Sequence, residues 1–315
     1  MINKNFGVVL LLLLILIFLT PPFQSPDEPA HLRYVQFIAQ HRSLPTEYTI
    51  ENAELLNQSS EIKEALERTE ANYIARNPNY HKQVGEAQPI SDETPVIHYI
   101  FNHPPLYYLW GAVIYLLAGT ADIITKMYLI RSFNIVFVIA AFYYTQRFTN
   151  LLKISPIAKK AILTLTMLWP MYLFVSAGVN NDVLLTTASI ATLGLAYEIT
   201  YKNRKHSRRH LLELAFWINV GLLTKAHFIP ILAYVGFVAV LNILIRNLLL
   251  LHSKDREINV TSFFGAFILV IMLAIPYINK NLYPSDINTY VSSSIVISTL
   301  ALLCSRYAYY KHIRK

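Results

Sequence analysis

The sequence predicts an all-α polytopic membrane protein with about eight transmembrane helices. Of its 315 residues, 54% are hydrophobic and only 15% are charged, and the mean hydropathy is +0.38. Soluble domains carry about a quarter charged residues. Apolar blocks recur along the whole chain, and short clusters of lysine and arginine separate them. The length allows about two domains, but the recurring blocks favour a single membrane domain over residues 1–315 that carries one long loop.

The first apolar run, residues 6–19, follows Lys4 and is closed by Pro21 and Pro22. Its shortness and basic start are also typical of a signal-peptide core. Because no small-residue cleavage site follows and further apolar blocks come later, we expect an uncleaved anchor that leaves the N-terminus in the cytoplasm.

A long loop follows and extends over residues 21–126. Its polar part, up to His103, holds 12 of the 19 acidic residues and 6 basic ones, which favours an extracytoplasmic location. Within the loop, residues 51–75 have helix-like apolar spacing, with a stripe at Leu55, Leu56, Ile62 and Leu66. The apolar stretch 104–118 begins with two prolines and is too short to span about 30 Å of hydrocarbon, so we expect a juxtamembrane or re-entrant segment.

The remaining topology follows from the basic clusters, which lie on the cytoplasmic side of membrane proteins. If all clusters and both termini are cytoplasmic, the blocks between them cross in pairs. Asp182 and Lys225 then lie on the same outer side as the long loop. The clusters span 147–160, 202–209, 246–256 and 311–315, and the spans after the loop are 127–146, 161–177, 183–199, 211–224, 226–245, 258–278 and 291–310.

Two carboxylates, Asp27 and Glu28, follow the first span directly. In one interpretation Ser25 caps a helix that starts at Pro26, and the acids occupy its favourable first turn. In the other, Asp27 and His31, four residues apart on one helix face, provide a general base or a metal ligand at the water–lipid boundary.

Four other patches are candidates on the same outer side. His103 precedes Pro104-Pro105, and Tyr107 follows them, which also describes an ordinary interfacial helix start. A lysine or arginine near the membrane can extend to the headgroups or hold an anion. These patches contain His103 and Tyr107, Arg131, Asn181 and Asp182, and Lys225.

Together these residues place carboxylates, histidines and cations on one face of the membrane. A carboxylate accepts the proton of an incoming hydroxyl, and Lys or Arg neutralises a phosphate leaving group. The net charge is +8. Because the lysines and arginines lie in clusters between the apolar blocks, they indicate the orientation of the spans, and we expect no nucleic-acid partner. The single cysteine, Cys304, excludes an internal disulfide and a cysteine zinc site.

The motifs, taken in order, resemble those of the GT-C glycosyltransferases, which include the aminoarabinose transferases of lipid A and the protein O-mannosyltransferases. An uncharacterised bacterial branch of multi-spanning proteins carries similar Asp-Glu-Pro-Ala-His and Asn-Asn-Asp motifs. The resemblance covers roughly residues 1–245. It rests on Ser25-Pro26-Asp27-Glu28-Pro29-Ala30-His31, His103-Pro104-Pro105-Leu106-Tyr107-Tyr108, Arg131, Asn180-Asn181-Asp182 and Gly221-Leu222-Leu223-Thr224-Lys225.

The resemblance implies a GT-C-like helical bundle in the inner membrane that uses a polyprenyl-phosphate sugar as donor. It implies inverting transfer to a glycan, lipid or protein acceptor on the outer face, and it allows a membrane partner protein. Asp27, Glu28 and Asp182 would be catalytic, and His31, His103, Tyr107, Arg131, Asn181 and Lys225 would bind substrate. A divalent metal, Mg or Mn, could bind at Asp27, His31 and His103. Larger relatives continue beyond the point where this chain stops, so acceptor binding would fall to the outer loop or to a partner.

Two other functions stay open. The first is a non-catalytic protein of the same fold, acting as a transporter, flippase or assembly factor for envelope glycans. Transport would predict repeat-related spans with buried charges at the bilayer midplane, and no internal repeat is visible. The second is a receptor for a soluble partner, which rests only on the acidity of the outer loop.

Overall fold

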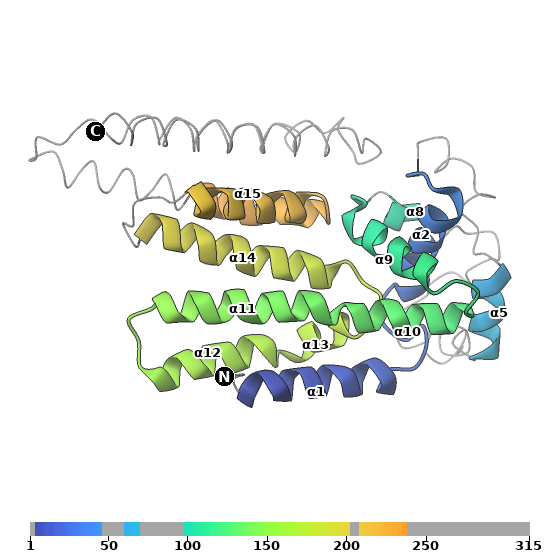
Figure 1. Ribbon diagram of the computed structural model, residues 1–315, viewed down its shortest axis with the longest axis horizontal. Helices are drawn as coiled ribbons and strands as arrows, with labels where there is room; N and C mark the ends of the chain where they lie inside the picture. Colours follow the sequence, from blue (N-terminus) through green and yellow to red (C-terminus); the bar gives the residue numbers. More distant parts are fainter. Residues whose placement is uncertain (1–3, 46–59, 70–97, 102, 202–207, 238–315) are drawn as a thin grey trace, which may run out of the picture. The chain divides into compact units, whose positions relative to one another are not determined.

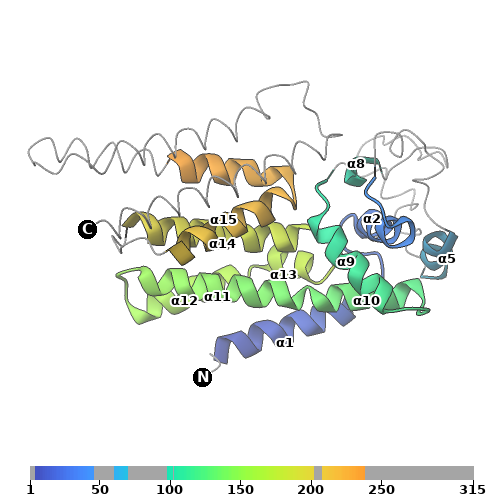
Figure 2. The same cartoon turned by 45° about the horizontal axis from the view of Figure 1, so that its top comes forward.

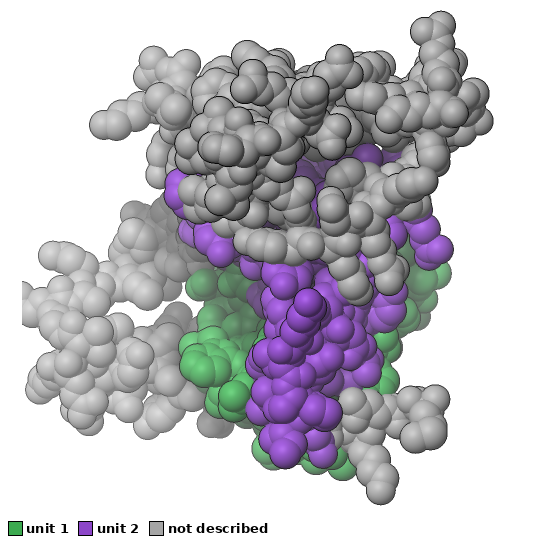
Figure 3. Space-filling model, turned by 90° about the vertical axis from the view of Figure 1, so that its left-hand side faces the viewer, with its two compact units in different colours: residues 1–139, 164–183 green, residues 140–163, 184–315 purple. Residues whose placement is uncertain are grey.

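The computed structural model describes residues 4–45, 60–69, 98–101, 103–201 and 208–237 (Figure 1). These residues form helices and, within these ranges, no strand, which confirms the predicted all-α class. The chain divides into two compact units (Figure 3). The first contains residues 1–139 and 164–183, and the second contains residues 140–163 and 184–315. The single membrane domain stays a prediction.

In the first unit, helix α1 (Lys4–Leu19) covers the predicted anchor run and packs against α10 (Ile123–Phe133) and α13 (Pro170–Ser176). Only one stripe of α1 is buried. Val9, Leu13 and Ile17 are buried, four residues apart, whereas most of the other large apolar side chains are exposed. An isolated soluble helix would not expose so much apolar surface, whereas lipid would cover it. The exposed residues are Val8, Leu11, Leu12, Leu14, Ile15, Phe18 and Leu19.

Helices α2 (Glu28–His41) and α9 (Leu106–Leu117) lie side by side in the first unit (Figures 1 and 2). Stacked rings join them, since the centroids of Tyr34 and Tyr108 are 3.9 Å apart. Phe101 of the short helix α8 (His98–Phe101) stacks on Tyr34 at 4.8 Å. Burial raises the pKa of the Tyr34 phenol above its usual range. The predicted short apolar segment 104–118 is therefore a helix packed on the first loop helix.

Helix α5 (Ser60–Arg68) confirms the amphipathic helix predicted over 51–75 for the part that is described. Its buried face consists of Ile62, Ala65 and Leu66, of which Ile62 and Leu66 belong to the predicted apolar stripe. The side-chain amide of Gln36 on α2 donates to Glu61 at 2.9 Å and thereby joins α5 to α2. The flanks 51–59 and 70–75 lie outside the described residues.

The predicted span 127–146 lies inside a longer one. Helix α10 and helix α11 (Ile135–Leu151) together form an apolar stretch from Ile123 to Leu151, interrupted only by a turn at Asn134 (Figure 2). Asp122 caps it by accepting a 2.7 Å hydrogen bond from the backbone of Thr125. That bond holds the pKa of the Asp122 carboxyl below its usual range.

The predicted span 161–177 is not one continuous helix, and its crossing stays a prediction. The chain forms α12 (Pro156–Met167) and then α13, with Trp169 in an extended conformation between them. Pro170 has no backbone N–H, and it disfavours helical backbone at the residue before it. The proline therefore divides the apolar block into two short helices.

The predicted block 183–199 forms α14 (Asp182–Tyr201), which lies in the second unit from Leu184 on. The predicted block 211–224 forms α15 (Arg208–Leu222) of the same unit. A further apolar helix covers Ala226–Phe237 and begins with the 3-10 turn η1 (Ala226–Phe228). Its approach to α15 is close, because a Cβ on Gly221 would lie 2.5 Å from the ring of Phe228. Glycine is therefore required there.

Two helices of the described part are long and apolar enough to cross a membrane, judged by length and composition: Ile123–Leu151 and Asp182–Ile199. The eight crossings and their orientation stay predictions. Blocks 258–278 and 291–310 and the clusters at 246–256 and 311–315 lie outside the described residues, as does the end of block 226–245.

Candidate functional site

A buried ion pair lies at the centre of the first unit. Glu28 begins α2 and Arg131 lies near the end of α10, and both side chains have no exposed surface. The pairing is bidentate, with Arg131 Nε 2.7 Å from Glu28 Oε1 and Nη2 2.5 Å from Oε2. Removing two charges from water is costly, so such a pair persists only when its remaining hydrogen bonds are also satisfied.

Both side chains are hydrogen-bonded to capacity by the chain itself. The Glu28 carboxylate also accepts from the backbone N–H groups of Phe23 at 3.0 Å and Val179 at 2.8 Å. Arg131 has five N–H donors. Two of them engage Glu28, and the other three reach backbone carbonyls. These are the carbonyls of Ile17 at 3.1 Å, Thr20 at 2.7 Å and Pro21 at 3.1 Å.

These hydrogen bonds connect segments that are far apart in sequence: the end of α1, the turn before α2, helix α10 and the loop before α14. The loop before α14 lies close to the turn before α2, because Gly178 lies against Ser25. A Cβ on Gly178 would fall 1.9 Å from Ser25 Oγ. Ser25 Oγ is buried and has no hydrogen-bond partner among the described residues.

The ion pair changes the interpretation of two candidates. Glu28 was expected to be catalytic and Arg131 to bind the donor phosphate. In this geometry neither has a free carboxylate oxygen or N–H for a ligand. We therefore interpret both as positioning residues that hold the surrounding loops in place.

Asp27 adopts an unusual conformation beside the pair. Its φ and ψ of 56° and 13° are left-handed, and its side chain is exposed and makes no capping hydrogen bond. A non-glycine residue in this region is uncommon, although Asp and Asn tolerate it best. Such strain persists where the surroundings fix the backbone, and it gathers at functional sites. The structure thus presents this carboxylate to solvent from a rigid base.

The capping prediction for this segment is wrong. Helix α2 begins at Glu28 rather than at Pro26, and Ser25 is buried and does not cap it. The shared helix face expected for Asp27 and His31 is wrong as well. Because Asp27 precedes the helix in a left-handed conformation, its side chain is exposed while that of His31 is buried.

The Asn-Asn-Asp motif is held by a second set of hydrogen bonds. The backbone N–H of Asn180 donates to the hydroxyl of Tyr107 at 3.0 Å, and that hydroxyl is 3.3 Å from Asn134 Oδ1. Asn134 Nδ2 donates to the carbonyl of Gly178 at 2.7 Å. Asp182 begins α14, and Asn180 Oδ1 accepts from its backbone at 2.8 Å. Tyr107 therefore positions the motif from within the core.

The two loops that bear the candidate acids are also joined directly. Asn180 Nδ2 donates to the carbonyl of Pro26 at 3.4 Å, one residue before Asp27. Asp182 is half-buried and Asn181 is fully buried. Glu28, Tyr107, Arg131 and Asp182 thus take part in the hydrogen bonds that join these segments of the first unit, and Asp27 and Asn181 are their neighbours in the chain.

The two candidate histidines have aromatic partners. His31 Nδ1 lies 2.9 Å from the hydroxyl of Tyr108, and the two rings stack at 5.8 Å. The carbonyl of His103 accepts from the hydroxyl of Tyr34 at 3.3 Å. No group of three or more His, Cys, Asp or Glu able to hold a metal occurs among the described residues. The divalent metal stays a prediction.

Lys225 belongs to the second unit. It lies in an extended backbone conformation between α15 and η1, and its backbone carbonyl accepts from Phe228 at 3.0 Å. Its side chain is partly exposed. Its expected role beside the donor phosphate stays a prediction.

Sequence reasoning missed two residues of the network, Asn134 and Gly178. Asn134 could have been noticed, since it is a polar residue in the middle of a predicted span, where such residues are costly and usually functional. Nothing in the local sequence indicates that Gly178 must approach Ser25.

The helices, the exposed apolar faces and the two long spans define an α-helical membrane protein. The chain belongs to the family DUF2142, described as a predicted membrane protein, whose family model matches residues 10–308. No curated protein and no solved structure matches it.

Proposed function

We propose that the chain is an integral membrane glycosyltransferase. It transfers a sugar from a polyprenyl-phosphate donor to an envelope glycan, lipid or protein acceptor on the outer face of the membrane. The observation that carries the proposal is Asp27, an exposed carboxylate in a strained conformation next to a fully satisfied buried ion pair. A strained acid on a rigid support is expected of a catalytic base more than of a helix cap.

In the proposed reaction the acceptor hydroxyl attacks the anomeric carbon of the donor sugar. The new carbon–oxygen bond forms as the bond to the phosphate oxygen breaks, and the configuration at that carbon inverts. Asp27 accepts the hydroxyl proton, and polyprenyl phosphate leaves with the bonding electrons. Lys225 would neutralise the phosphate, and Asp182 with Asn181 would orient the acceptor.

Glu28 and Arg131 act through Asp27 in this proposal. They fix the turn that carries it, so their removal should impair transfer by disordering the loop. Tyr107 has the corresponding role for the Asn-Asn-Asp motif, because its hydroxyl holds the backbone of Asn180. The steps described need no metal. Glycan profiling of complemented cells with and without a metal chelator tests whether a metal takes part.

The test is glycan and glycolipid profiling of cells that lack the protein, complemented at matched expression. Wild type should restore a missing sugar, and Asp27→Asn should not. Asparagine keeps the size of the side chain and its tolerance for left-handed backbone, so the variant should fold.

Glu64→Gln is the matched control, since Glu64 is an exposed acid of α5 with the same charge change. It should restore the sugar as wild type does. Restoration by Asp27→Asn to the wild-type level would refute the assigned base and favour a non-catalytic role in envelope glycan assembly.

A further inference from the structure

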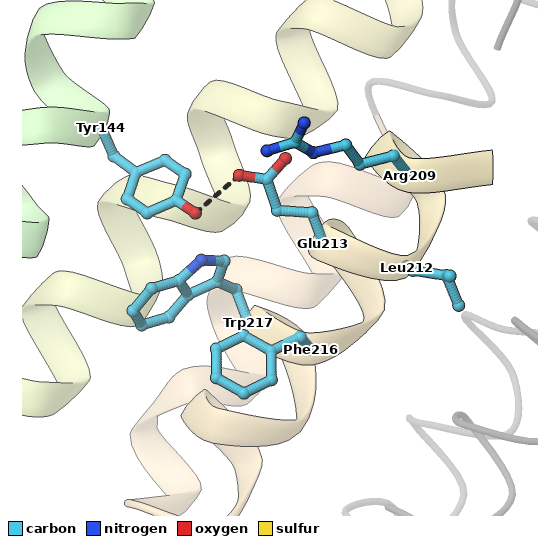
Figure 4. Close-up of a pocket in the computed structure, with 6 residues that line it drawn as sticks. All are labelled: Tyr144, Arg209, Leu212, Glu213, Phe216 and Trp217. Carbon is cyan, nitrogen blue, oxygen red and sulfur yellow. Dashed lines mark hydrogen bonds between the residues drawn. The ribbon is translucent and has the colours of Figure 1, made fainter. Parts of the chain in front are cut away.

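An open groove of about 610 Å³ lies in the second unit (Figure 4). Polar groups gather at one end of it and apolar rings at the other. It is lined by Tyr144, Arg209, Leu212, Glu213, Phe216 and Trp217.

The groove lies next to a charged layer at the ends of the two long spans. Arg147 is near the end of the span Ile123–Leu151, and Glu198 is near the end of the span Asp182–Ile199. Charged groups at membrane depth are costly, so this layer marks the level of the lipid headgroups. On the predicted topology it is the cytoplasmic leaflet.

One carboxylate oxygen in the groove is left for a ligand. Glu213 Oε1 accepts from the hydroxyl of Tyr144 and from Arg147 Nη1, each at 2.7 Å. Within the described part of the chain, Glu213 Oε2 accepts no hydrogen bond, and the side chain is 21% exposed. A partly buried carboxylate oxygen favours a cationic hydrogen-bond donor.

Charges of both signs surround the groove, and His210 also lies 3.7 Å from Glu198; such a surrounding favours a ligand with both signs. Arg147 and Arg209 carry two positive charges, and Glu198 and Glu213 carry two negative charges. Arg147 pairs with both glutamates, at 2.8 and 2.7 Å. Arg209, one turn before Glu213 on α15, is exposed and points toward the same part of the groove (Figure 4).

The other end of the groove is aromatic. Trp217 is buried, and its ring meets that of Tyr144 edge-on at 5.2 Å. Phe216 is 58% exposed. Tryptophan and tyrosine favour the headgroup level, and an exposed phenylalanine beside them would pack against the first carbons of an acyl chain.

From these contacts we propose that the groove binds the headgroup of a phosphatidylethanolamine molecule from the surrounding membrane. Its primary ammonium donates to Glu213 Oε2, its phosphate pairs with Arg209, and its acyl chain covers Phe216. This proposal does not rest on the glycosyltransferase activity.

The test uses the full-length protein, purified and delipidated in detergent. Thermal unfolding is followed while short-chain phosphatidylethanolamine, phosphatidylcholine or phosphatidylglycerol is added. A ligand that binds the folded state raises the unfolding temperature with its concentration. Phosphatidylethanolamine should bind about tenfold more tightly than the other two, because only it has both charges and ammonium N–H donors.

Glu213→Gln should abolish the preference, because it removes the oxygen that accepts from the ammonium. Arg209→Gln should weaken the binding of all three lipids about tenfold, because all three carry the phosphate. Because Glu213 also holds Tyr144 and Arg147, each variant is compared with its own unfolding temperature without lipid, which separates a change in stability from a change in binding. Tyr234→Leu replaces another exposed aromatic of the second unit that lies outside the groove, and it should keep the preference. Equal binding of the three lipids by the wild type, stronger binding of phosphatidylglycerol, a preference that persists in Glu213→Gln, or unchanged lipid binding by Arg209→Gln would overturn the proposal.

Discussion

The Glu28–Arg131 pair and the Arg147–Glu198–Glu213 cluster are both arginine–carboxylate networks in an apolar helical protein. The first has no exposed side-chain surface. In the second, the three side chains are 20%, 10% and 21% exposed. The chain supplies every partner of Glu28 and Arg131, whereas Glu213 keeps one oxygen open to the groove. A network whose hydrogen-bonding groups are all paired within the chain can only hold the neighbouring loops in place. A network with an unpaired oxygen can also bind a ligand.

Removal of one partner of the buried pair should have the largest effect. Arg131→Met would leave the charge of Glu28 buried without compensation and would leave three backbone carbonyls without their donors. We expect a loss of about 3–5 kcal/mol in the free energy of unfolding, measured by chemical unfolding in detergent micelles. A smaller loss of unfolding free energy than in Arg147→Gln, which removes the cation of the Arg147–Glu198–Glu213 cluster, would contradict the buried geometry.

A methyl group placed next to the pair should also be costly. In Gly178→Ala the new Cβ would lie 1.9 Å from Ser25 Oγ and 2.4 Å from Ser25 Cβ, so we expect a loss of about 1–3 kcal/mol. Gly194→Ala is the control in the second unit, because its Cβ would meet Phe148 Cβ at an ordinary 3.5 Å. Unfolding midpoints that fall equally in both variants would show that the packing around Gly178 is not tight.

The partly exposed cluster should be less sensitive. Arg147→Gln removes the cation that joins Glu198 and Glu213, but both carboxylates keep some exposed surface and other hydrogen-bonding or ion-pair partners, Tyr144 and His210. We expect a loss of about 1 kcal/mol, measured in the same micelles as Arg131→Met. An equal loss in the two variants would remove the distinction between a fully paired network and one with an unpaired oxygen.

The sequence predicted the helical class, the long spans over 127–146 and 183–199 and the amphipathic stripe with Ile62 and Leu66, because these depend on local apolar periodicity. It also selected Glu28 and Arg131, since ionisable residues near a membrane stand out. It did not predict that the two bind each other, because their partnership spans 103 positions in the chain.

The incorrect predictions have causes that a periodicity pattern does not capture. Pro170 divides the block 161–177 because it lacks a backbone N–H. The left-handed backbone of Asp27 depends on contacts of its neighbour Glu28 with Phe23 and Val179, which lie outside the motif. The cap of the first interpretation is therefore absent, and Asp27 has an exposed carboxylate instead.

The most direct measurement of the central claim combines the unfolding free energy and the glycan profile of Asp27→Gly. Glycine adopts left-handed backbone without strain, so the variant should be as stable as wild type or more stable by about 0.5–1 kcal/mol. If Asp27 is the base, this well-folded protein should fail to restore the missing sugar in cells that lack the wild type. Restoration of the sugar by Asp27→Gly would contradict the account, because sugar transfer would then proceed without the carboxylate at position 27.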